Sequence, residues 1–372
     1  MSTEYVPATY TNVLDRMLAR GARPGQGGHL EGNAEEVMAA VIRLAASCWA
    51  FLVTEIVNVL GMESAETMVV NIARCQGGYR GTLIRRELES RGLPLDVAHA
   101  MNYWNGGSLG EQGYLPHYGE WHEPGCPMYD QWSQLAPQAL TFLQCQESHR
   151  SVAREINPAI QVSFPALLTR GQPECVIRFS MTVEQAEEAA RQAERLRQEA
   201  TKAGRTLAGE REPWGDDPAR YYGTFAALNA LYFHCTANEL LAAGEEQREN
   251  ILRRAMRKWG AWRGNTMAED HQKRGWPLDV QTLITYFDDP AAGDAWLAEN
   301  VTLSPSEHTK DIVKSAYTAR FEEIGTGGIA AIMFEEALPA QAKAYNPKIE
   351  LSLPMLMERG DSVTRLSYSM SD

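Results

Sequence analysis

The hydrophobic pattern divides the chain into long helical stretches that are followed by short alternating ones. Residues 41–62 form the longest apolar run, VIRLAASCWAFLVTEIVNVLGM, which holds Arg43 and Glu55 and is flanked by acidic residues. An apolar run of this length predicts a helix, and its internal charges favour a helix buried in a folded core over one that crosses a membrane.

A second, amphipathic helix is expected to end at Arg91. Gly92 stands where a helix C-cap places its left-handed residue, Pro94 blocks continuation, and Asp96 is placed to cap the next helix. The same succession of residue types occurs a second time in the chain, at Arg274, Gly275, Pro277 and Asp279.

Short alternating stretches follow these helices. Ile160, Val162 and Phe164 alternate with polar residues, and a second β-rich stretch covers residues 176–179. The segment 170–173, Arg-Gly-Gln-Pro, carries turn chemistry between them, which predicts two antiparallel strands joined as a hairpin. Because helices come first and strands last, the fold class is expected to be α+β.

The chain also contains two pairs of matching blocks. Residues 72–103 align without a gap with 255–286, and residues 157–175 align without a gap with 346–364. The offset is 183 residues in the first pair and 189 in the second, so six extra residues lie between the later blocks. This predicts two homologous tandem repeats, each helical first and ending in a small antiparallel sheet.

The blocks set the expected domain boundaries. Four parts are expected: an N-terminal extension (1–29), the first repeat (30–181), a charged linker helix and loop (182–219) and the second repeat (220–372). Residues 183–203 are rich in Ala, Glu, Gln and Arg, which predicts a solvated helix that ends at Gly204.

Composition excludes some partners. The formal net charge is −13 at pH 7, and no basic cluster stands out, which argues against a nucleic acid or an anionic membrane as partner. The N-terminus has no basic start followed by an apolar segment, so a cytoplasmic protein with reduced cysteines is expected. A small-molecule substrate is the expected partner, and pairing of the repeats suggests a pseudo-dimer within one chain or a homodimer.

Candidate chemistry gathers in the first repeat, where none of the common phosphate-binding, zinc-protease or serine-hydrolase motifs is present. Cys126, Cys145 and Cys175 are a possible nucleophile, a set of metal ligands or small core residues. All three thiols are missing together from the second repeat, which suggests that they act together. Their counterparts, at an offset of 189, are Ser315, Phe334 and Thr364.

Histidines offer two interpretations. His117, His122 and Cys126 have the spacing of a partial zinc site that Cys145 or Cys175 would complete, although no cofactor is the expectation. Alternatively, His122 or His149 is a general base beside a thiolate, or a plain surface histidine.

An aromatic, glycine-rich segment between residues 102 and 132 can line a small-molecule pocket or simply cover the sheet. Arg80 is either a clamp for a substrate carboxylate or a structural residue, and its recurrence as Arg263 favours the structural role. The candidate substrate-binding side chains are Tyr79, Arg80, Tyr118 and Trp121.

With these residues the first repeat resembles the L-2-amino-thiazoline-4-carboxylate hydrolase family. The resemblance rests on Cys126-Pro127, Cys145, Asn157-Pro158, Gly171 and Cys175, with Gly77 to Gly81 upstream. The final hairpin is also similar to sensor domains of the four-vinyl-reductase type.

The resemblance implies hydrolysis of a small cyclic C–N bond, as in opening a thiazoline ring. Cys126 or Cys175 would attack the sp² carbon, and the second repeat would be a non-catalytic copy. The acidic residue expected just after Cys145 is not clear, and Glu147 or His149 would take its place. Two rival functions are a non-catalytic small-molecule sensor on the same fold and a metal-dependent enzyme that uses His117, His122 and Cys126.

Overall fold

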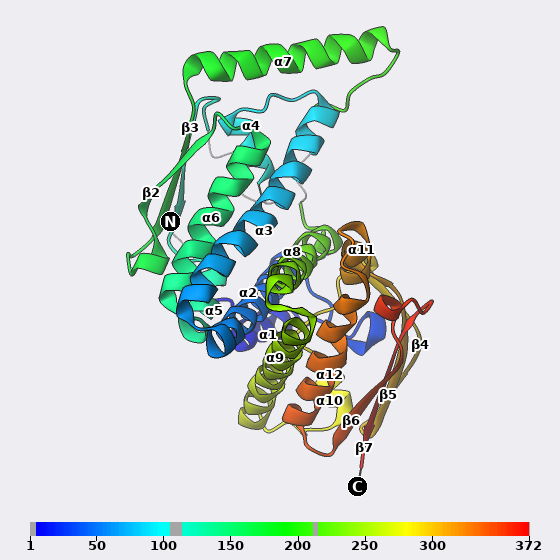
Figure 1. The fold of residues 1–372 in the computed structure, drawn as a ribbon. Coiled ribbons are helices and arrows are strands. Elements are labelled where there is room, and N and C mark those ends of the chain that lie inside the picture. The colour runs from blue at the N-terminus through cyan, green and yellow to red at the C-terminus, as the bar shows by residue number, and fades with distance from the viewer. Residues whose placement is uncertain (1–4, 105–113, 211–214, 372) are drawn as a thin grey trace. The chain divides into compact units, whose positions relative to one another are not determined.

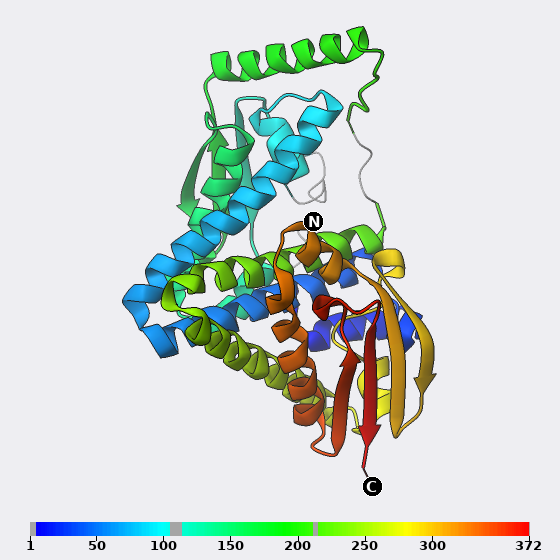
Figure 2. The same cartoon turned by 45° about the vertical axis from the view of Figure 1, so that its right-hand side comes forward.

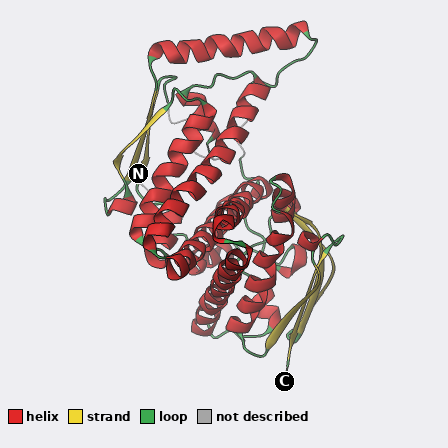
Figure 3. Ribbon diagram, viewed as in Figure 1, coloured by secondary structure: helices red, strands yellow, loops and turns green. Residues whose placement is uncertain are grey.

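The computed structural model describes residues 5–104, 114–210 and 215–371 (Figure 1). Internal contacts divide the chain into two compact units. The larger unit comprises residues 1–68, 127–137 and 216–372, and the smaller unit comprises residues 69–126 and 138–215. Helices and antiparallel strands occur in both, so the expected α+β class is confirmed (Figure 3).

The larger unit packs helices against one face of a four-stranded antiparallel sheet of order β4-β5-β7-β6 (Figure 2). Its helices are α1 (Tyr10–Ala19), α2 (Ala34–Leu60), α5 (Pro127–Leu135), α8 (Pro218–Glu239), α9 (Glu245–Lys273), α10 (Val280–Thr285), α11 (Ala316–Glu323) and α12 (Ala331–Tyr345). Its strands are β4 (Trp296–Leu303), β5 (Glu307–Ser315), β6 (Ile349–Met355) and β7 (Thr364–Met370). Short 3-10 turns are η1 (Gln26–Gly28), η3 (Leu240–Ala243), η4 (Gly293–Ala295), η5 (Gly327–Ala330) and η6 (Met357–Arg359).

Helix α2 is the long apolar helix that the sequence predicts. It begins with a capping box, in which Asn33 accepts from the backbone of Glu36 and the Glu36 carboxylate accepts from the backbone of Asn33. By length and composition α2 is apolar enough to cross a membrane, but 83% of its most apolar window is buried within the protein. Because buried core helices pass the same test, this is weak support for a membrane span, and it agrees with the expected core helix.

Glu55 shows how α2 accommodates a charge. Its side chain is fully buried, and it forms salt bridges with Arg254 and Lys258 of α9. A carboxylate without such partners would be costly to bury, so this position fixes α2 against α9.

The smaller unit contains a three-stranded antiparallel sheet of order β1-β3-β2 and helices on one of its faces (Figure 1). Its elements are α3 (Met62–Arg91, which begins in the larger unit), α4 (Val97–Tyr103), β1 (Tyr118–Glu123), α6 (Gln138–Ile156), β2 (Gln161–Ala166), η2 (Leu168–Arg170), β3 (Cys175–Ser180) and α7 (Val183–Lys202). The predicted hairpin corresponds to β2 and β3. Strand β1 was not predicted, because its segment was read as part of an aromatic loop.

Helix α7 is the predicted linker helix, and it ends as expected before Gly204, which has a φ of 70°. It is not solvated on every side. Ala186, Ala189, Ala193 and Ala200 are buried, and Arg197 donates to the backbone oxygen of Gly92 at 2.7 Å. The helix therefore packs one alanine-lined face within its unit.

The predicted helix ends are confirmed in both units. Gly92 and Gly275 have φ values of 69° and 72°, in the left-handed region that a helix C-cap requires. Asp96 accepts from the backbone N–H of His99, and Asp279 accepts from that of Thr282.

The two sheets share their strand register. Strand β1 pairs with β3 from Tyr118 opposite Ser180 to Glu123 opposite Cys175. Residues 189 positions later, Glu307 to Ile312 of β5, pair with Ser369 to Thr364 of β7. The β2–β3 pairing shifts register between Ser163 and Ala166, and the β6–β7 pairing shifts between Ser352 and Met355, again 189 positions later.

Hydrogen bonds in the hairpin loops also recur at this offset. The backbone N–H of Leu167 donates to Gln172, and that of Leu356 donates to Asp361. The next N–H groups point into the adjoining strand: Leu168 donates to the sulfur of Cys175, and Met357 donates to the hydroxyl of Thr364. The loop thus positions the first residue of β3 and of β7 in the same way.

Close helix packing depends on glycine pairs. A Cβ at Gly77 or Gly81 of α3 would lie 2.5 or 2.6 Å from a backbone oxygen of α6, and a Cβ at Gly260 or Gly264 of α9 would overlap the backbone oxygen of Ala337 or Gln341 of α12. These distances are shorter than any real contact, so a larger residue would push the paired helices apart.

This packing predicts that Gly264→Ala destabilises the larger unit by about 1–3 kcal/mol, because overpacking forces a backbone shift. Gly223→Ala is the matched control in α8, where a Cβ would meet no atom within 4 Å. It should raise stability by ~0.5–1 kcal/mol, because alanine favours a helix over glycine. Urea unfolding of both variants measures the difference, and equal effects would refute the packing argument.

Candidate functional sites

Cys175 is the thiol of the smaller unit whose surroundings the structure describes most fully. It is 7% exposed and begins β3, where the backbone N–H of Leu168 donates to its sulfur at 3.4 Å. Its side chain belongs to the apolar cluster on the helix side of the sheet, together with Ile177 and Phe179. Burial raises the pKa of the Cys175 thiol, and the N–H of Leu168 partly offsets this.

Cys145 and Cys126 lie near Cys175. Cys145 is on α6, and Cys126 directly precedes α5. Burial raises the pKa of Cys145 well above its usual range, and the neighbouring Cys175 and Cys126 raise it further. Cys145 is thus within electrostatic range of both, and it packs against the apolar cluster that contains Cys175.

None of these three thiols is in a disulfide, and neither is Cys48 of the larger unit. Cys75 and Cys235 are disulfide-bonded. The expectation that all six cysteines are reduced is therefore wrong for these two.

His149 lies one turn after Cys145 on α6. Its Nδ1 donates to the backbone oxygen of Cys145 at 2.6 Å and lies 3.9 Å from that residue's sulfur. The ring stacks on Trp104, with 5.7 Å between centroids and 16° between planes. Burial lowers the pKa of His149 to about 4, so the imidazole is neutral at pH 7 with its lone pair on Nε2.

Glu123 is a functional candidate that the sequence did not reveal. It ends β1 directly opposite Cys175, it accepts from the indole N–H of Trp121 at 2.9 Å, and burial raises its pKa. The missing signal was β1 itself. Once Tyr118–Glu123 is known to be a strand, alternation places Trp121 and Glu123 on the helix side of the sheet and His122 on the other.

His122 is consequently not beside the thiols. It is exposed on the opposite face, where its Nε2 lies 3.0 Å from Glu120 and its Nδ1 lies 3.4 Å from Glu174. Tyr118 is on the same face and donates to Glu120 at 2.7 Å. Of the two histidines proposed as a general base, only His149 is brought near a cysteine.

Of the other predicted site residues, Glu147 belongs to the surface, whereas Arg80 lies near His149. Glu147 is bound by Arg74 and Arg150, each at 3.0 Å, and so belongs to a surface ion-pair cluster. Arg80 on α3 lies close enough to His149 to lower its pKa. Tyr79 is partly buried on the same helix.

No group of three or more His, Cys, Asp or Glu side chains in the described ranges is arranged to hold a metal ion. Of the proposed ligands, His122 faces Glu120 and Glu174 on the exposed side of the sheet. The zinc alternative therefore gains no geometric support.

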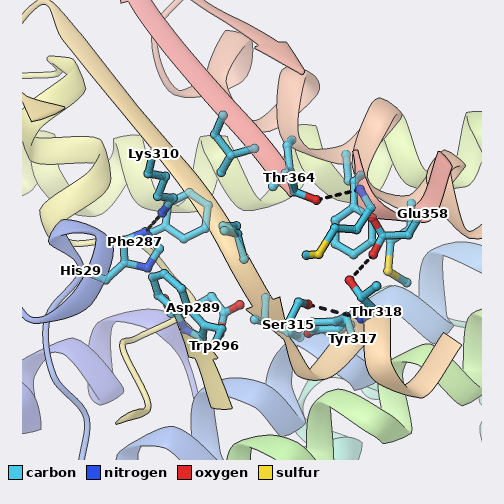
Figure 4. Close-up of a pocket in the computed structure, with 18 of the residues that line it drawn as sticks. His29, Phe287, Asp289, Trp296, Lys310, Ser315, Tyr317, Thr318, Glu358 and Thr364 are labelled. Atoms are coloured by element: carbon cyan, nitrogen blue, oxygen red, sulfur yellow. Dashed lines mark hydrogen bonds between the residues drawn. The ribbon is translucent and has the colours of Figure 1, made fainter. Parts of the chain in front are cut away.

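The larger unit contains a cavity of about 110 Å³ between its sheet and its helices (Figure 4). The apolar part of its wall is formed by Leu44, Trp259, Phe287, Trp296, Ile312, Tyr317, Met333, Phe334, Ala337, Leu338, Met357, Leu366 and Tyr368. Ser315, Phe334 and Thr364, the sequence counterparts of the three thiols, all line it.

A buried charge cluster adjoins this cavity, because one of its members, Arg263, lines the cavity. Asp288 accepts from Arg263 at 2.7 and 2.9 Å, from Arg43 at 2.9 Å and from Gln341 at 2.9 Å, and the two arginines are 4% and 2% exposed. Burial alone would raise the pKa of Asp288, but the two guanidinium groups hold it well below its usual range. The structural role that the sequence favoured for the recurring arginine is confirmed for Arg263.

Lys310 and His29 form one polar end of the cavity. The Lys310 Nζ lies 2.7 Å from His29 Nε2, and His29 Nδ1 lies 2.8 Å from the backbone oxygen of Asp289. Burial lowers the pKa of Lys310 to about 7 and raises that of Asp289 to about 6. Burial thus brings the pKa of each group closer to neutral pH.

The other polar end contains hydroxyl groups and one carboxyl (Figure 4). Thr318 donates to Glu358 at 2.5 Å, Ser315 accepts from the backbone of Thr318, and Thr364 accepts from the backbone of Met357. Burial raises the pKa of Glu358, whose second oxygen has no partner in the described part of the chain.

Comparison with known proteins adds no relative: no protein-family model, curated protein or solved structure significantly matches this chain.

The charge cluster predicts that Asp288→Asn lowers the free energy of unfolding by about 3–5 kcal/mol, because it leaves two buried guanidinium groups without their carboxylate. Asp294→Asn is the control, since Asp294 is exposed, and it should change stability by less than ~0.5 kcal/mol. Chemical denaturation of both variants tests this, and a mild effect of Asp288→Asn would contradict it.

Proposed function

We propose that this protein is a hydrolase that opens a small cyclic C–N bond at the thiol site of the smaller unit. The observation that carries the proposal is the opposition of Cys175 and Glu123 across two paired strands, with Cys145 and His149 in the same region. A nucleophile beside a base, surrounded by apolar side chains that exclude water, is the usual arrangement for covalent catalysis.

The proposed mechanism begins with a protonated thiol, because burial raises the pKa of both Cys145 and Cys175. Glu123 takes the Cys175 proton as the sulfur attacks the sp² carbon of an amidine-like group, and a carboxylate of raised pKa is the stronger base for this step. The N–H of Leu168 stabilises the sulfur's developing charge.

Ring opening completes the first half of the reaction. The carbon–sulfur bond has formed, the ring C–N bond breaks, and the leaving nitrogen takes the proton that Glu123 holds. Water then attacks the carbon, gives its proton to Glu123, and displaces the Cys175 sulfur, which takes that proton back. At the end of the cycle Glu123 and Cys175 are back in their starting protonation states, and the reaction needs no co-reactant besides water.

His149 and Arg80 have supporting roles in this proposal. The neutral His149 presents Nε2 as an acceptor for a substrate N–H, since Nδ1 is used by the Cys145 backbone. Arg80 lies near this ring and would hold a substrate carboxylate, with Tyr79 and Trp121 as neighbouring walls. His122, Tyr118 and Glu147 have no part in the reaction, because their contacts lie elsewhere.

We further propose that the chain arose by tandem duplication. The shared register of the two sheets, the recurring loop hydrogen bonds and the recurring glycine contacts support this. In this interpretation the second copy has Ser315, Phe334 and Thr364 in place of the thiols, and these three residues line its cavity. A cytoplasmic location stays a prediction, and the two disulfide-bonded cysteines count against a strongly reducing compartment.

The alternative function, small-molecule binding without catalysis, is favoured by one observation, the cavity of the larger unit. Concave, largely apolar cavities with a few polar groups are typical ligand sites. The two functions occupy different units and are tested separately.

The mechanism predicts that Cys175→Ala abolishes ring opening of 2-amino-thiazoline-4-carboxylate and that Glu123→Gln lowers kcat by ~10²–10⁴-fold. Cys48→Ala is the matched control, because Cys48 is a buried thiol of the larger unit. Product formation is measured by mass spectrometry. Full activity in the Cys126, Cys145 and Cys175 variants alike would exclude the thiol mechanism.

The raised pKa values predict slow alkylation at rest. Iodoacetamide should modify Cys145 and Cys175 slowly at pH 7, and the rate should rise only above about pH 9, where thiolates form. Peptide mapping over a pH series measures this for each cysteine. A fast reaction of Cys175 at pH 7 would show a preformed thiolate and remove the need for Glu123 as a base.

A further inference from the structure

Lys310 is a buried lysine that the scaffold does not require. It lies on β5, is 3% exposed and lines the cavity of the larger unit. The residue 189 positions earlier, at the same register position of β1, is Trp121, whose ring packs into an apolar cluster. An apolar residue therefore fits this strand position, and a lysine here loses hydration that an apolar residue would not.

The surroundings of Lys310 hold its amine without a salt bridge. Across the described ranges no carboxylate lies within salt-bridge distance of Nζ; its polar partner is the neutral ring of His29 at 2.7 Å. The amine also lies 4.9 Å from the ring centroid of Trp296. Because His29 Nδ1 is directed at the backbone oxygen of Asp289, its Nε2 is the acceptor, and one Lys310 N–H points to it.

Asp289 supplies an acid close to this amine. Its Oδ2 accepts from the hydroxyl of Tyr222 at 2.9 Å, and its Oδ1 is buried without a partner among the described residues. The carboxyl lines the same cavity and is the largest favourable electrostatic influence on Lys310. It can therefore give a proton to a group bound next to the lysine and take it back.

We propose that the cavity of the larger unit binds a small uncharged aldehyde or ketone and that Lys310 joins it as an imine. The neutral amine attacks the carbonyl carbon, a carbon–nitrogen bond forms, and the oxygen takes a proton from Asp289. The carbinolamine then loses this oxygen as water, after the two nitrogen protons have passed to the oxygen and to Asp289. Amine and carbonyl give imine and water, with no oxidant or reductant.

The cavity defines the ligand class. A cavity of about 110 Å³ is somewhat smaller than the cavity of roughly 150 Å³ that is known to bind benzene, so it suits a short unbranched carbonyl compound. Its walls are mostly aromatic and aliphatic, and its two carboxyl groups, Asp289 and Glu358, stand at opposite polar ends. Arg263 also lines the cavity, but Asp288 binds its guanidinium, so this cation is not available to a carboxylate ligand. A carboxylate would lose its hydration among the apolar walls, so the carbonyl compound is uncharged. The hydroxyls of Ser315 and Thr364 can bind a hydroxyl substituent.

This activity is independent of the proposed thiol chemistry. Its residues belong to the larger unit, whereas Cys175 and Glu123 belong to the smaller one. A failure of one proposal leaves the other untouched.

The test is reductive trapping on the full-length protein. The protein is incubated with pentanal and sodium cyanoborohydride at pH 7.5, digested, and mapped by mass spectrometry. We expect Lys310 to be alkylated at least about tenfold faster than Lys314, an exposed lysine on the same strand, because a buried neutral amine reacts without first losing a proton. Glyoxylate, a smaller but charged aldehyde, should label Lys310 far more slowly than pentanal.

Two further readouts keep the test decisive. Labelling of Lys310 should be fastest at about pH 6.5 and fall on either side, because the reaction needs both a neutral Lys310 and a protonated Asp289, whose pKa values are about 7 and about 6. Labelling of Lys314 should keep rising toward pH 10. Lys310→Met should remove the fast label while Lys314→Met leaves it. Equal rates at the two lysines, or equal labelling by pentanal and glyoxylate, would overturn the proposal. If Lys310→Met fails to fold, the relative labelling of Lys310 and Lys314 in the wild-type protein still tests the proposal.

Discussion

The packing of the helices in the larger unit depends on the buried ion pairs and hydrogen bonds of the Asp288 carboxylate. Asp288 follows α10 and is bound by Arg43 of α2, Arg263 of α9 and Gln341 of α12, so one buried anion ties three helices together. An isolated carboxylate would be very costly to bury, and so would either arginine, but the set satisfies its charges and hydrogen bonds internally. Asp288 also constrains the next residue, Asp289. With the Asp288 side chain bound to the three helices, the Asp289 side chain lines the cavity. The charge cluster and the Lys310 end of the cavity are therefore linked through the adjacent residues Asp288 and Asp289.

Packing and chemistry are carried by different residues. Backbone hydrogen bonds, strand register, the left-handed glycines and the close helix contacts recur 189 or 183 residues apart. The side chains on the helix-facing side of each sheet do not recur. Cys175 has Thr364 at its place, Trp121 has Lys310 and Glu123 has Ile312. Close packing constrains the backbone contacts but not the identity of these side chains. Two similar sheets can therefore carry side chains of different chemical character.

Sequence reasoning succeeded where the cause is local. Asp96, Gly92 and Gly171 act through bonds within a few residues of themselves, so caps and hairpins were predictable. It failed for β1, because YGEWHE contains only one strongly apolar residue and two glutamates, and its strand character comes from pairing with β3. Because β1 was not predicted, the sequence could not show that Glu123 lies on the helix side of the sheet. The charge cluster was equally hidden, since Arg43 and Asp288 are 245 residues apart and meet only in the folded unit.

Burial has opposite consequences for the two proposed nucleophiles. Removing water favours the neutral form of every ionisable group, which raises the pKa of a thiol and lowers that of an amine. For a thiol the neutral form is the unreactive one, so Cys175 needs a base at the moment of attack, and the register of β1 and β3 places Glu123 opposite it. For an amine the neutral form is the nucleophile itself, so Lys310 is made reactive by the same desolvation that holds the thiols at rest. In these proposals the thiol site needs groups from several elements, whereas the lysine site needs an apolar cavity and a nearby acid.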